Sequence, residues 1–208
     1  MSAKFIRRIV EVFIAIFFIG GFLQIGRAVA AMFDGKFGTV RWPVEASAFD
    51  LQAPVGEGVQ AWFTDATLAV PGQPFWHSVD LLFSLTNIGI FIAALMLLRS
   101  VLANFTAGDL VDEENASAMR KIGLLLLAAC GLSVVRAVLL QSAILSAVQE
   151  QAGTVLHPSI SWDVSGMTNV WLHYDVPIFT FALGGLALLF AEAFRAGVAY
   201  RKDSESVV

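Results

Sequence analysis

Arg136 is the charged residue with the least favourable position in the sequence, because it lies within a long apolar run, residues 122–147. At 1.5 Å per residue along a helix, Arg136 falls near the middle of that run. A guanidinium at the centre of a lipid layer costs about 3 kcal/mol or more, so we expect it to face polar partners inside the protein. Such an arginine either fixes the packing of neighbouring helices or binds an anionic or carbonyl group of a ligand.

Polar residues at helical spacing supply candidate partners for this arginine. Asp80, Ser84 and Asn87 would lie on one face of a helix, and Gln24 and Arg27 form a similar stripe earlier in the chain. A structural network and a ligand or ion site are both open interpretations. We predict a polar cluster in the outer half of a helix bundle, with these members: Arg27, Gln24, Asp80, Asn87, Arg136 and Asp175.

A second group of charged residues lies in the polar stretch 104–123, between two apolar runs, where acids precede Arg120 and Lys121. Acids at this place suit the first turn of a helix, because they cap its free amides and face the positive end of its dipole. They also suit a docking surface for a basic cytoplasmic protein. The two roles are compatible. The predicted partner-binding residues are Phe105, Asp109, Asp112, Glu113, Glu114, Asn115 and Arg120.

The motifs of common enzyme sites do not occur in the sequence. It has no nucleotide-binding glycine loop, no HExxH and no GxSxG. Cys130 is the one cysteine, which excludes an internal disulfide and a cysteine-rich metal site. His77 and His173 stand at the starts of two apolar runs, where a haem is conceivable, but interfacial histidines explain them better. We therefore expect no enzymatic activity, no catalytic residue, no metal and no cofactor.

Four apolar runs must position these residues. The chain has 208 residues, of which 57% are hydrophobic and 14% charged, with a mean hydropathy of +0.74. Crossing a lipid layer takes about 20 apolar residues in a helix. The runs predict one membrane domain, 1–208, with an uncleaved first helix; its spans are about 9–31, 79–102, 122–147 and 174–200.

The distribution of basic residues predicts the orientation of these spans. Lysines and arginines gather near the termini and the central loop, 103–121, while the loops 34–77 and 148–173 hold few. By the positive-inside rule, both termini, the central loop and the tail 201–208 are expected in the cytoplasm. A net charge of −4 argues against direct binding of nucleic acid.

The two outward loops differ in composition from the spans. They are rich in Gly, Pro, Trp and β-branched residues, and the runs 38–44, 59–70, 159–164 and 168–174 read as short strands. The predicted fold class is thus an all-α membrane protein, a bundle of four transmembrane helices with a small β-rich extracytoplasmic cap formed by the first and third loops. We expect Gly20, Gly21, Gly184 and Gly185 to be close-packing points between helices.

The central stretch and the C-terminal end carry motifs of a known family. Residues 105–123 read FTAGDLVDEENASAMRKIG, and residues 189–197 read LFAEAFRAG before an acidic tail. This pattern resembles that of the four-helix bacterial membrane proteins defined by domain of unknown function 2975. The resemblance implies four membrane helices, a place in the inner membrane of a bacterial cell and no established enzymatic activity. It also implies a frequent genomic neighbour, a small helix-turn-helix regulator.

Two functions from different classes follow. The first is a non-enzymatic regulatory or sensory membrane protein that holds a small cytoplasmic DNA-binding regulator. The second is a small transporter, or an accessory subunit of a membrane complex, that uses the Arg136 and Asp80 cluster. The inner halves of the second and third runs, 88–98 and 122–132, hold almost no polar residues, which disfavours a continuous transport path.

Overall fold

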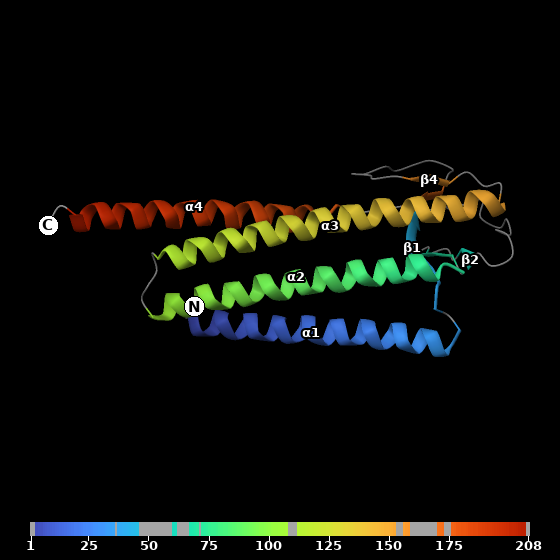
Figure 1. Cartoon of the computed structure of the whole chain (residues 1–208), viewed down its shortest axis with the longest axis horizontal. Helices are drawn as coiled ribbons and strands as arrows, with labels where there is room; N and C mark the ends of the chain where they lie inside the picture. Colours follow the sequence, from blue (N-terminus) through green and yellow to red (C-terminus); the bar gives the residue numbers. More distant parts are fainter. Residues whose placement is uncertain are drawn as a thin grey trace. The chain divides into compact units, whose positions relative to one another are not determined.

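Four long helices dominate the computed structural model of the chain, and Figure 1 shows their arrangement. They are α1 (Ala3–Phe33), α2 (Pro74–Ala107), α3 (Glu113–Ala152) and α4 (Ile178–Ser206). Each is long and apolar enough to cross a membrane, which confirms the four predicted helices. The structure describes residues 3–35, 37–45, 60–61, 67–70, 72–107, 112–152, 156–158, 170–172 and 176–206.

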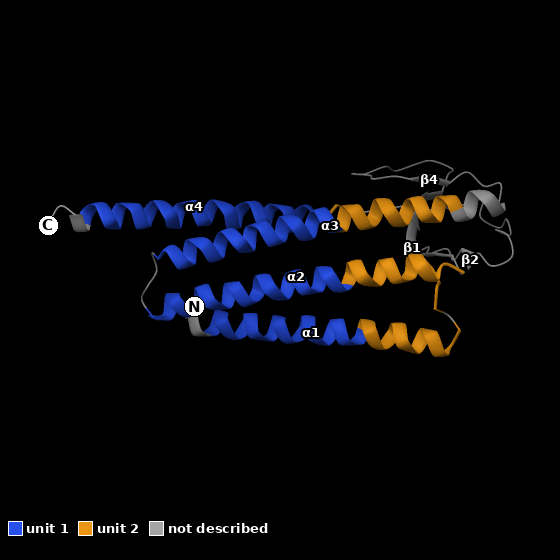
Figure 2. Cartoon of the chain, viewed as in Figure 1, with its two compact units in different colours: residues 1–23, 85–132, 177–208 blue, residues 24–84, 133–176 orange. Residues whose placement is uncertain are grey.

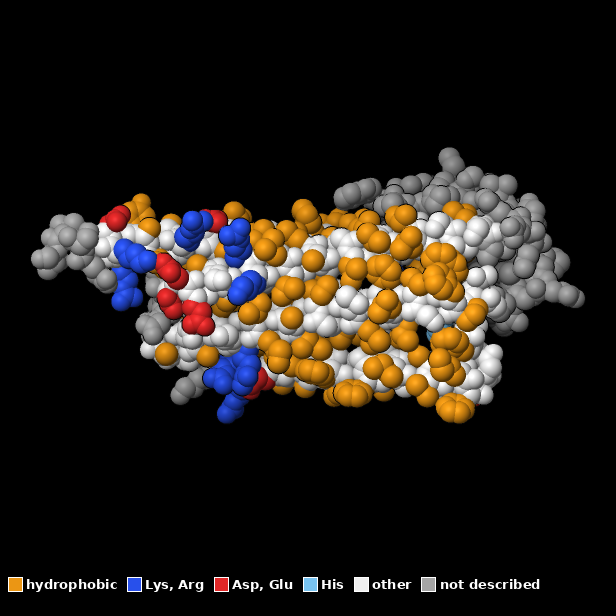
Figure 3. All heavy atoms as spheres, in the orientation of Figure 1, with side chains coloured by type: hydrophobic (Ala, Val, Ile, Leu, Met, Phe, Trp, Pro, Cys, Tyr) orange, Lys and Arg blue, Asp and Glu red, His pale blue; other side chains and the backbone are white. Residues whose placement is uncertain are grey.

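The surfaces of these helices are apolar rather than charged along most of their length. In α1, Phe22 is 73% exposed and Phe33 88%, and in α4 Phe179 is 77% exposed. Figure 3 shows hydrophobic side chains over much of the visible face. A protein in water rarely exposes so large a continuous apolar surface, because its contact with water is unfavourable. Helix length and surface together indicate a multi-pass membrane protein.

The helices extend further into the central connection than predicted. Because α2 runs to Ala107 and α3 begins at Glu113, most of the predicted loop 103–121 is helical. Residues 116–121, ASAMRK, are mostly good helix formers, and Glu113 and Glu114 favour the N-terminal end of α3. In contrast, α4 begins later than predicted, at Ile178 rather than at residue 174. It follows Pro177 directly, and the carbonyl oxygen of Pro177 accepts a hydrogen bond from the amide of Phe181 at 3.0 Å.

The chain divides into two compact units (Figure 2). Unit 1 comprises residues 1–23, 85–132 and 177–208, and therefore contains α4 together with parts of α1, α2 and α3. Unit 2 comprises residues 24–84 and 133–176, which include the remaining parts of α1, α2 and α3 and all the described strands.

The core of unit 1 lies between α2, α3 and α4. Ala94, Ile122 and Ala187 are buried there, with leucines of α2 and α3 packed around them. Elsewhere in unit 1, the rings of Phe17 in α1 and Phe91 in α2 stack with their centroids 5.5 Å apart.

Two glycines allow α3 and α4 to approach closely. A Cβ on Gly123 would lie 2.7 Å from Cγ of Leu188 and 2.9 Å from the carbonyl oxygen of Gly184. Only a residue without a side chain fits at such a contact. Close packing is confirmed at Gly184, whereas at Gly20 and Gly185 it is wrong, because no atom lies within 4 Å of the position of a Cβ.

Unit 2 carries a small sheet made from both of the other connections. Its strands are β1 (Val40–Glu45), β2 (Gln60–Ala61), β3 (Thr67–Val70), β4 (Leu156–Pro158) and β5 (Val170–Leu172). They are ordered β2-β3-β1-β5-β4, and all neighbours are antiparallel except β4 and β5. The pairing of Val44 with Leu172 joins the first connection to the third. The predicted strand 159–164 lies outside the described residues.

The sheet begins from a turn that is fixed to the start of α2. Gly38 has a φ of +97°, a conformation that favours glycine, and its carbonyl accepts the amide of Gln73 at 2.7 Å. Nδ1 of His77 lies 3.2 Å from the carbonyl oxygen of Thr39, and the ring of Phe37 packs edge-on against that imidazole. These contacts give His77 a structural role.

Candidate functional site

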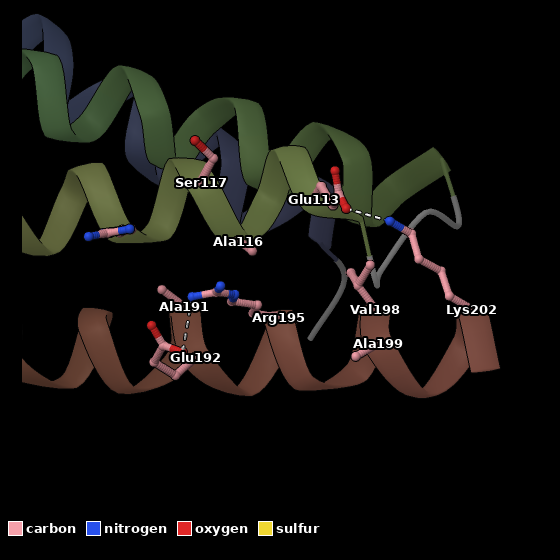
Figure 4. Close-up of a pocket in the computed structure, with 10 residues that line it drawn as sticks. Glu113, Ala116, Ser117, Ala191, Glu192, Arg195, Val198, Ala199 and Lys202 are labelled. Atoms are coloured by element: carbon pink, nitrogen blue, oxygen red, sulfur yellow. Dashed lines mark hydrogen bonds and ion pairs between the residues drawn. The ribbon is translucent and has the colours of Figure 1, made fainter. Parts of the chain in front are cut away.

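A groove between the start of α3 and the end of α4 gathers charged side chains from both helices (Figure 4). We call it the α3–α4 groove. It lies within unit 1 and has a volume of about 410 Å³. It is lined by Glu113, Ala116, Ser117, Arg120, Ala191, Glu192, Arg195, Val198, Ala199 and Lys202.

Helical spacing places these residues on one face of each helix. In α3 the lining positions 113, 116, 117 and 120 follow the pattern i, i+3, i+4, i+7, and in α4 positions 191, 195, 198 and 202 repeat in the same way. Alanines at 116, 191 and 199 leave room between the helices, while longer charged side chains line the groove beside them. Figure 4 shows the side chain of Arg195 extending between the two helices.

One ion pair crosses the groove. Nζ of Lys202 donates to Oε1 of Glu113 at 2.6 Å, so the last turns of α4 lie beside the first turn of α3. Both side chains are mostly exposed and stand beyond the apolar parts of their helices. This hydrogen bond, together with the positive charge of Lys202, lowers the pKa of Glu113, and the same contact raises the pKa of Lys202.

The remaining groove cations are held less tightly. Nη1 of Arg195 lies 4.0 Å from Oε2 of Glu192, and both side chains are exposed. In the described part of the chain, Arg120 takes part in none of the ion pairs. The groove therefore contains two guanidinium groups, one from each helix: Arg195 has a carboxylate at 4.0 Å, and Arg120 forms no ion pair among the described residues.

The predicted partner-binding residues separate into exposed and internal ones. Asp112 and Glu114 are exposed at the start of α3, and Glu113 and Arg120 line the groove. Asp109 lies outside the described residues.

Two members of that set make contacts between helices of unit 1. Asn115 is fully buried, and its Oδ1 accepts a hydrogen bond from Nδ2 of Asn104 at 2.9 Å, which joins α3 to α2. Phe105 packs its ring edge-on against Phe194 of α4, with centroids 6.1 Å apart. The place of Asn115 in a docking surface is therefore a wrong prediction, because its side chain is buried between helices of unit 1. Phe105 is only partly buried, and its place in that surface stays a prediction.

The predicted contact between Arg136 and Asp80 is present in unit 2. Nε of Arg136 donates to Oδ1 of Asp80 at 2.6 Å, joining α3 to α2. The side chains are 37% and 28% exposed. A charged hydrogen bond of this length is among the stronger polar contacts in proteins.

Among the described residues, no ion pair joins another predicted member of the polar cluster to Arg136 or Asp80. Arg27 is exposed and has no ion pair with any residue that the structure describes, so its predicted approach to Asp80 is wrong. The physical reason is that a long arginine side chain near a helix end can extend outward. Gln24 has a buried Oε1 with no hydrogen-bond partner in the same part of the chain. Asn87 belongs to unit 1, and Asp175 lies outside the described residues.

Metal binding finds no support among the described residues, where no three His, Cys, Asp or Glu side chains gather in a way that could hold an ion. Cys130 is buried and free. The side chains of His157 and His173 lie outside the described part of the structure.

From the sequence, Arg195 and Lys202 served only to predict which side of the membrane is cytoplasmic. Their place in one groove with Arg120 was not predicted. The signal was present, because positions 113–120 and 191–202 each carry a charged face at helical spacing. Comparison with protein-family models, with curated proteins and with solved structures finds no match to this chain.

Proposed function

We propose that the chain is a non-enzymatic regulatory membrane protein that holds a small basic DNA-binding protein, of the helix-turn-helix type, at the start of α3. The observation that carries this proposal is the exposure of Asp112 and Glu114 beside the α3–α4 groove. In the part of the chain that the structure describes, neither carboxylate forms an ion pair. Both are therefore available to a basic partner, for which charge complementarity speeds association and selects the orientation.

Three contacts within unit 1 support the cytoplasmic placement that this function needs. Glu113 binds Lys202, Asn104 binds Asn115, and Oε1 of Glu11 accepts Nε of Arg99 at 2.9 Å. They bring the first turns of α1, the end of α2, the start of α3 and the end of α4 to one end of unit 1. Most of the basic residues of the chain lie on these segments, and the positive-inside rule assigns such an end to the cytoplasm.

The proposed membrane is the bacterial inner membrane, and the proposed place of the sheet is its outer side. Strands from the first and third connections pair with each other, which is what an extracytoplasmic cap built from both would require. In this arrangement the cap receives the stimulus and the start of α3 holds the regulator.

The test is co-purification of the full-length chain from native membranes, with the bound proteins identified by mass spectrometry. We expect a small helix-turn-helix protein to be retained by the unmodified chain and lost from the double variant Asp112→Lys, Glu114→Lys. Asp34→Lys, which reverses an exposed acid of unit 2, is the matched control and should retain it. Retention by both variants, or the absence of any DNA-binding protein, would reject the proposed partner.

The ion pair of Arg136 with Asp80 favours a second candidate, a small transporter or accessory subunit. Charged residues within membrane helices often mark a pathway for ions or substrates. For this candidate, Asp80→Asn should abolish solute uptake by proteoliposomes when uptake is measured per amount of folded protein. If the unmodified chain takes up no solute, and Asp80→Asn abolishes the response of the regulator in cells, the first function is favoured.

A further inference from the structure

The α3–α4 groove has a closed end and an open end. The contact of Gly123 with Gly184 and Leu188 brings the two helices together. All lining residues of α3 precede Gly123, and all those of α4 follow Leu188. The groove therefore lies between the helices on the side of this contact where Glu113 and Lys202 are found, and it ends where the apolar packing of the core begins.

This closed end coincides with the start of the apolar part of α3. Ile122 is a core residue with 6% exposure, and Arg120 precedes it by two residues, about 3 Å along a helix. The polar groups of a lipid layer begin at such a boundary. Arg120 is thus placed where the phosphates of membrane lipids lie.

The charges of the groove leave an excess of one cation. Arg120, Arg195 and Lys202 face Glu113 and Glu192, and Lys202 is already held by Glu113. The ion pair between Arg195 and Glu192 is weak, because its two atoms are 4.0 Å apart and both side chains are exposed. An anionic ligand can therefore replace the carboxylate of Glu192. A guanidinium presents parallel donors that match two oxygens of one phosphate, and here one comes from each helix.

We propose that the α3–α4 groove binds the phosphate group of an anionic phospholipid between Arg120 and Arg195. The volume of about 410 Å³ falls in the range of small-molecule sites. Leu124 is 52% exposed and stands four residues after Arg120, on the same side of α3, where an acyl chain can lie against it. This apolar surface favours a lipid over a free phosphate. The inference needs only the membrane location and does not depend on the proposed protein partner.

The experiment measures lipid retention by native mass spectrometry of the full-length chain, released from an uncharged detergent after exposure to phosphatidylglycerol or phosphatidylcholine. We expect phosphatidylglycerol to be retained in preference. Arg120→Gln and Arg195→Gln should each lower its retention about tenfold, because each removes hydrogen bonds from a charged donor to the phosphate. Lys121→Gln is the matched control, since it removes the same charge from the adjacent position, which does not line the groove.

A second pair of variants separates a built site from general attraction between charges. Ala199→Leu fills the groove without changing charge and should lower retention of phosphatidylglycerol, whereas Ala193→Leu, at an exposed position of α4 outside the groove, should not. Both keep the helix formers that α4 needs, so the amount of folded protein serves as the common reference.

Three outcomes would overturn the proposal. They are equal retention of phosphatidylcholine and phosphatidylglycerol, an equal loss in Lys121→Gln and Arg120→Gln, and an unchanged retention in Ala199→Leu. Competition with inorganic phosphate distinguishes a lipid phosphate from a free phosphate as the ligand of the groove. If it displaces phosphatidylglycerol completely at concentrations matched to that lipid, the groove is a site for soluble phosphate and the lipid is rejected.

Discussion

Arg136 of α3 and Asp80 of α2 form an ion pair in which 2.6 Å separates Nε from Oδ1. Each residue stands in a helix that is apolar enough to cross a membrane. Removing one partner leaves the other charge without compensation, whereas removing both replaces the pair by apolar contact.

We predict that Arg136→Leu and Asp80→Leu each destabilise the protein by about 1–2 kcal/mol, a value reduced from that of a fully buried pair because both side chains are partly exposed. The double variant should cost less than the two single variants together. Reversible unfolding in mixed micelles gives the three free energies, and a double-mutant cycle with no coupling would show that the contact contributes nothing.

Gly123 offers a prediction with a control on the same helix. Gly123→Ala should destabilise unit 1 by about 1–3 kcal/mol, because its Cβ would overlap Leu188 and the backbone of Gly184. Gly131→Ala meets no atom within 4 Å and should stabilise α3 by about 0.5–1 kcal/mol through helix propensity alone. Thermal unfolding in detergent distinguishes them, and equal effects would contradict the close contact.

Asn115 gives a third prediction. Its side chain is fully buried and accepts a hydrogen bond from Asn104, so Asn115→Ala should cost about 1–3 kcal/mol. Glu114→Ala, at the exposed adjacent position, should change the free energy of unfolding by less than about 0.5 kcal/mol. The same unfolding assay applies. If Asn115 instead lies on a docking surface, its replacement will weaken partner binding without affecting stability.

The buried thiol of Cys130 allows the topology to be tested. In the unmodified chain this thiol should react slowly with a maleimide until the protein is unfolded, because it is 7% exposed. A membrane-impermeant maleimide applied to intact cells should then label Asp34→Cys and leave Glu114→Cys unlabelled. Labelling of Glu114→Cys before lysis would place the start of α3 outside the cell and remove the proposed docking function.

The four helices were predictable from the length of the apolar runs, and the pair of Arg136 with Asp80 from the depth of the two charges in the membrane. An apolar run of about 20 residues forms a helix in lipid whatever its partners, and a charge within it must find an opposite charge at a similar level. The helical ends within 103–121 were missed because their polar residues suggested a loop, although ASAMRK favours a helix.

The groove and the contact of Asn104 with Asn115 could not be predicted in the same way. Both depend on which residues of two helices face each other. For the groove, which lies between α3 and α4, that register is set by the close approach at Gly123 and Gly184, whereas the asparagine contact joins α2 to α3. Arg27 shows the opposite error, since a polar stripe at helical spacing does not decide whether its end points inward or outward.

The contact of Gly123 with Gly184 gives the two helices a pivot. From Gly123 to Glu113 is a lever arm of about 15 Å, since each residue adds about 1.5 Å. A tilt of about 4° around the pivot therefore moves the far end of the arm by about 1 Å. That displacement is enough to break or remake the hydrogen bond between Glu113 and Lys202. A rocking motion of this size, which would leave the packed core undisturbed, would therefore open and close the ion pair that joins the two helix ends.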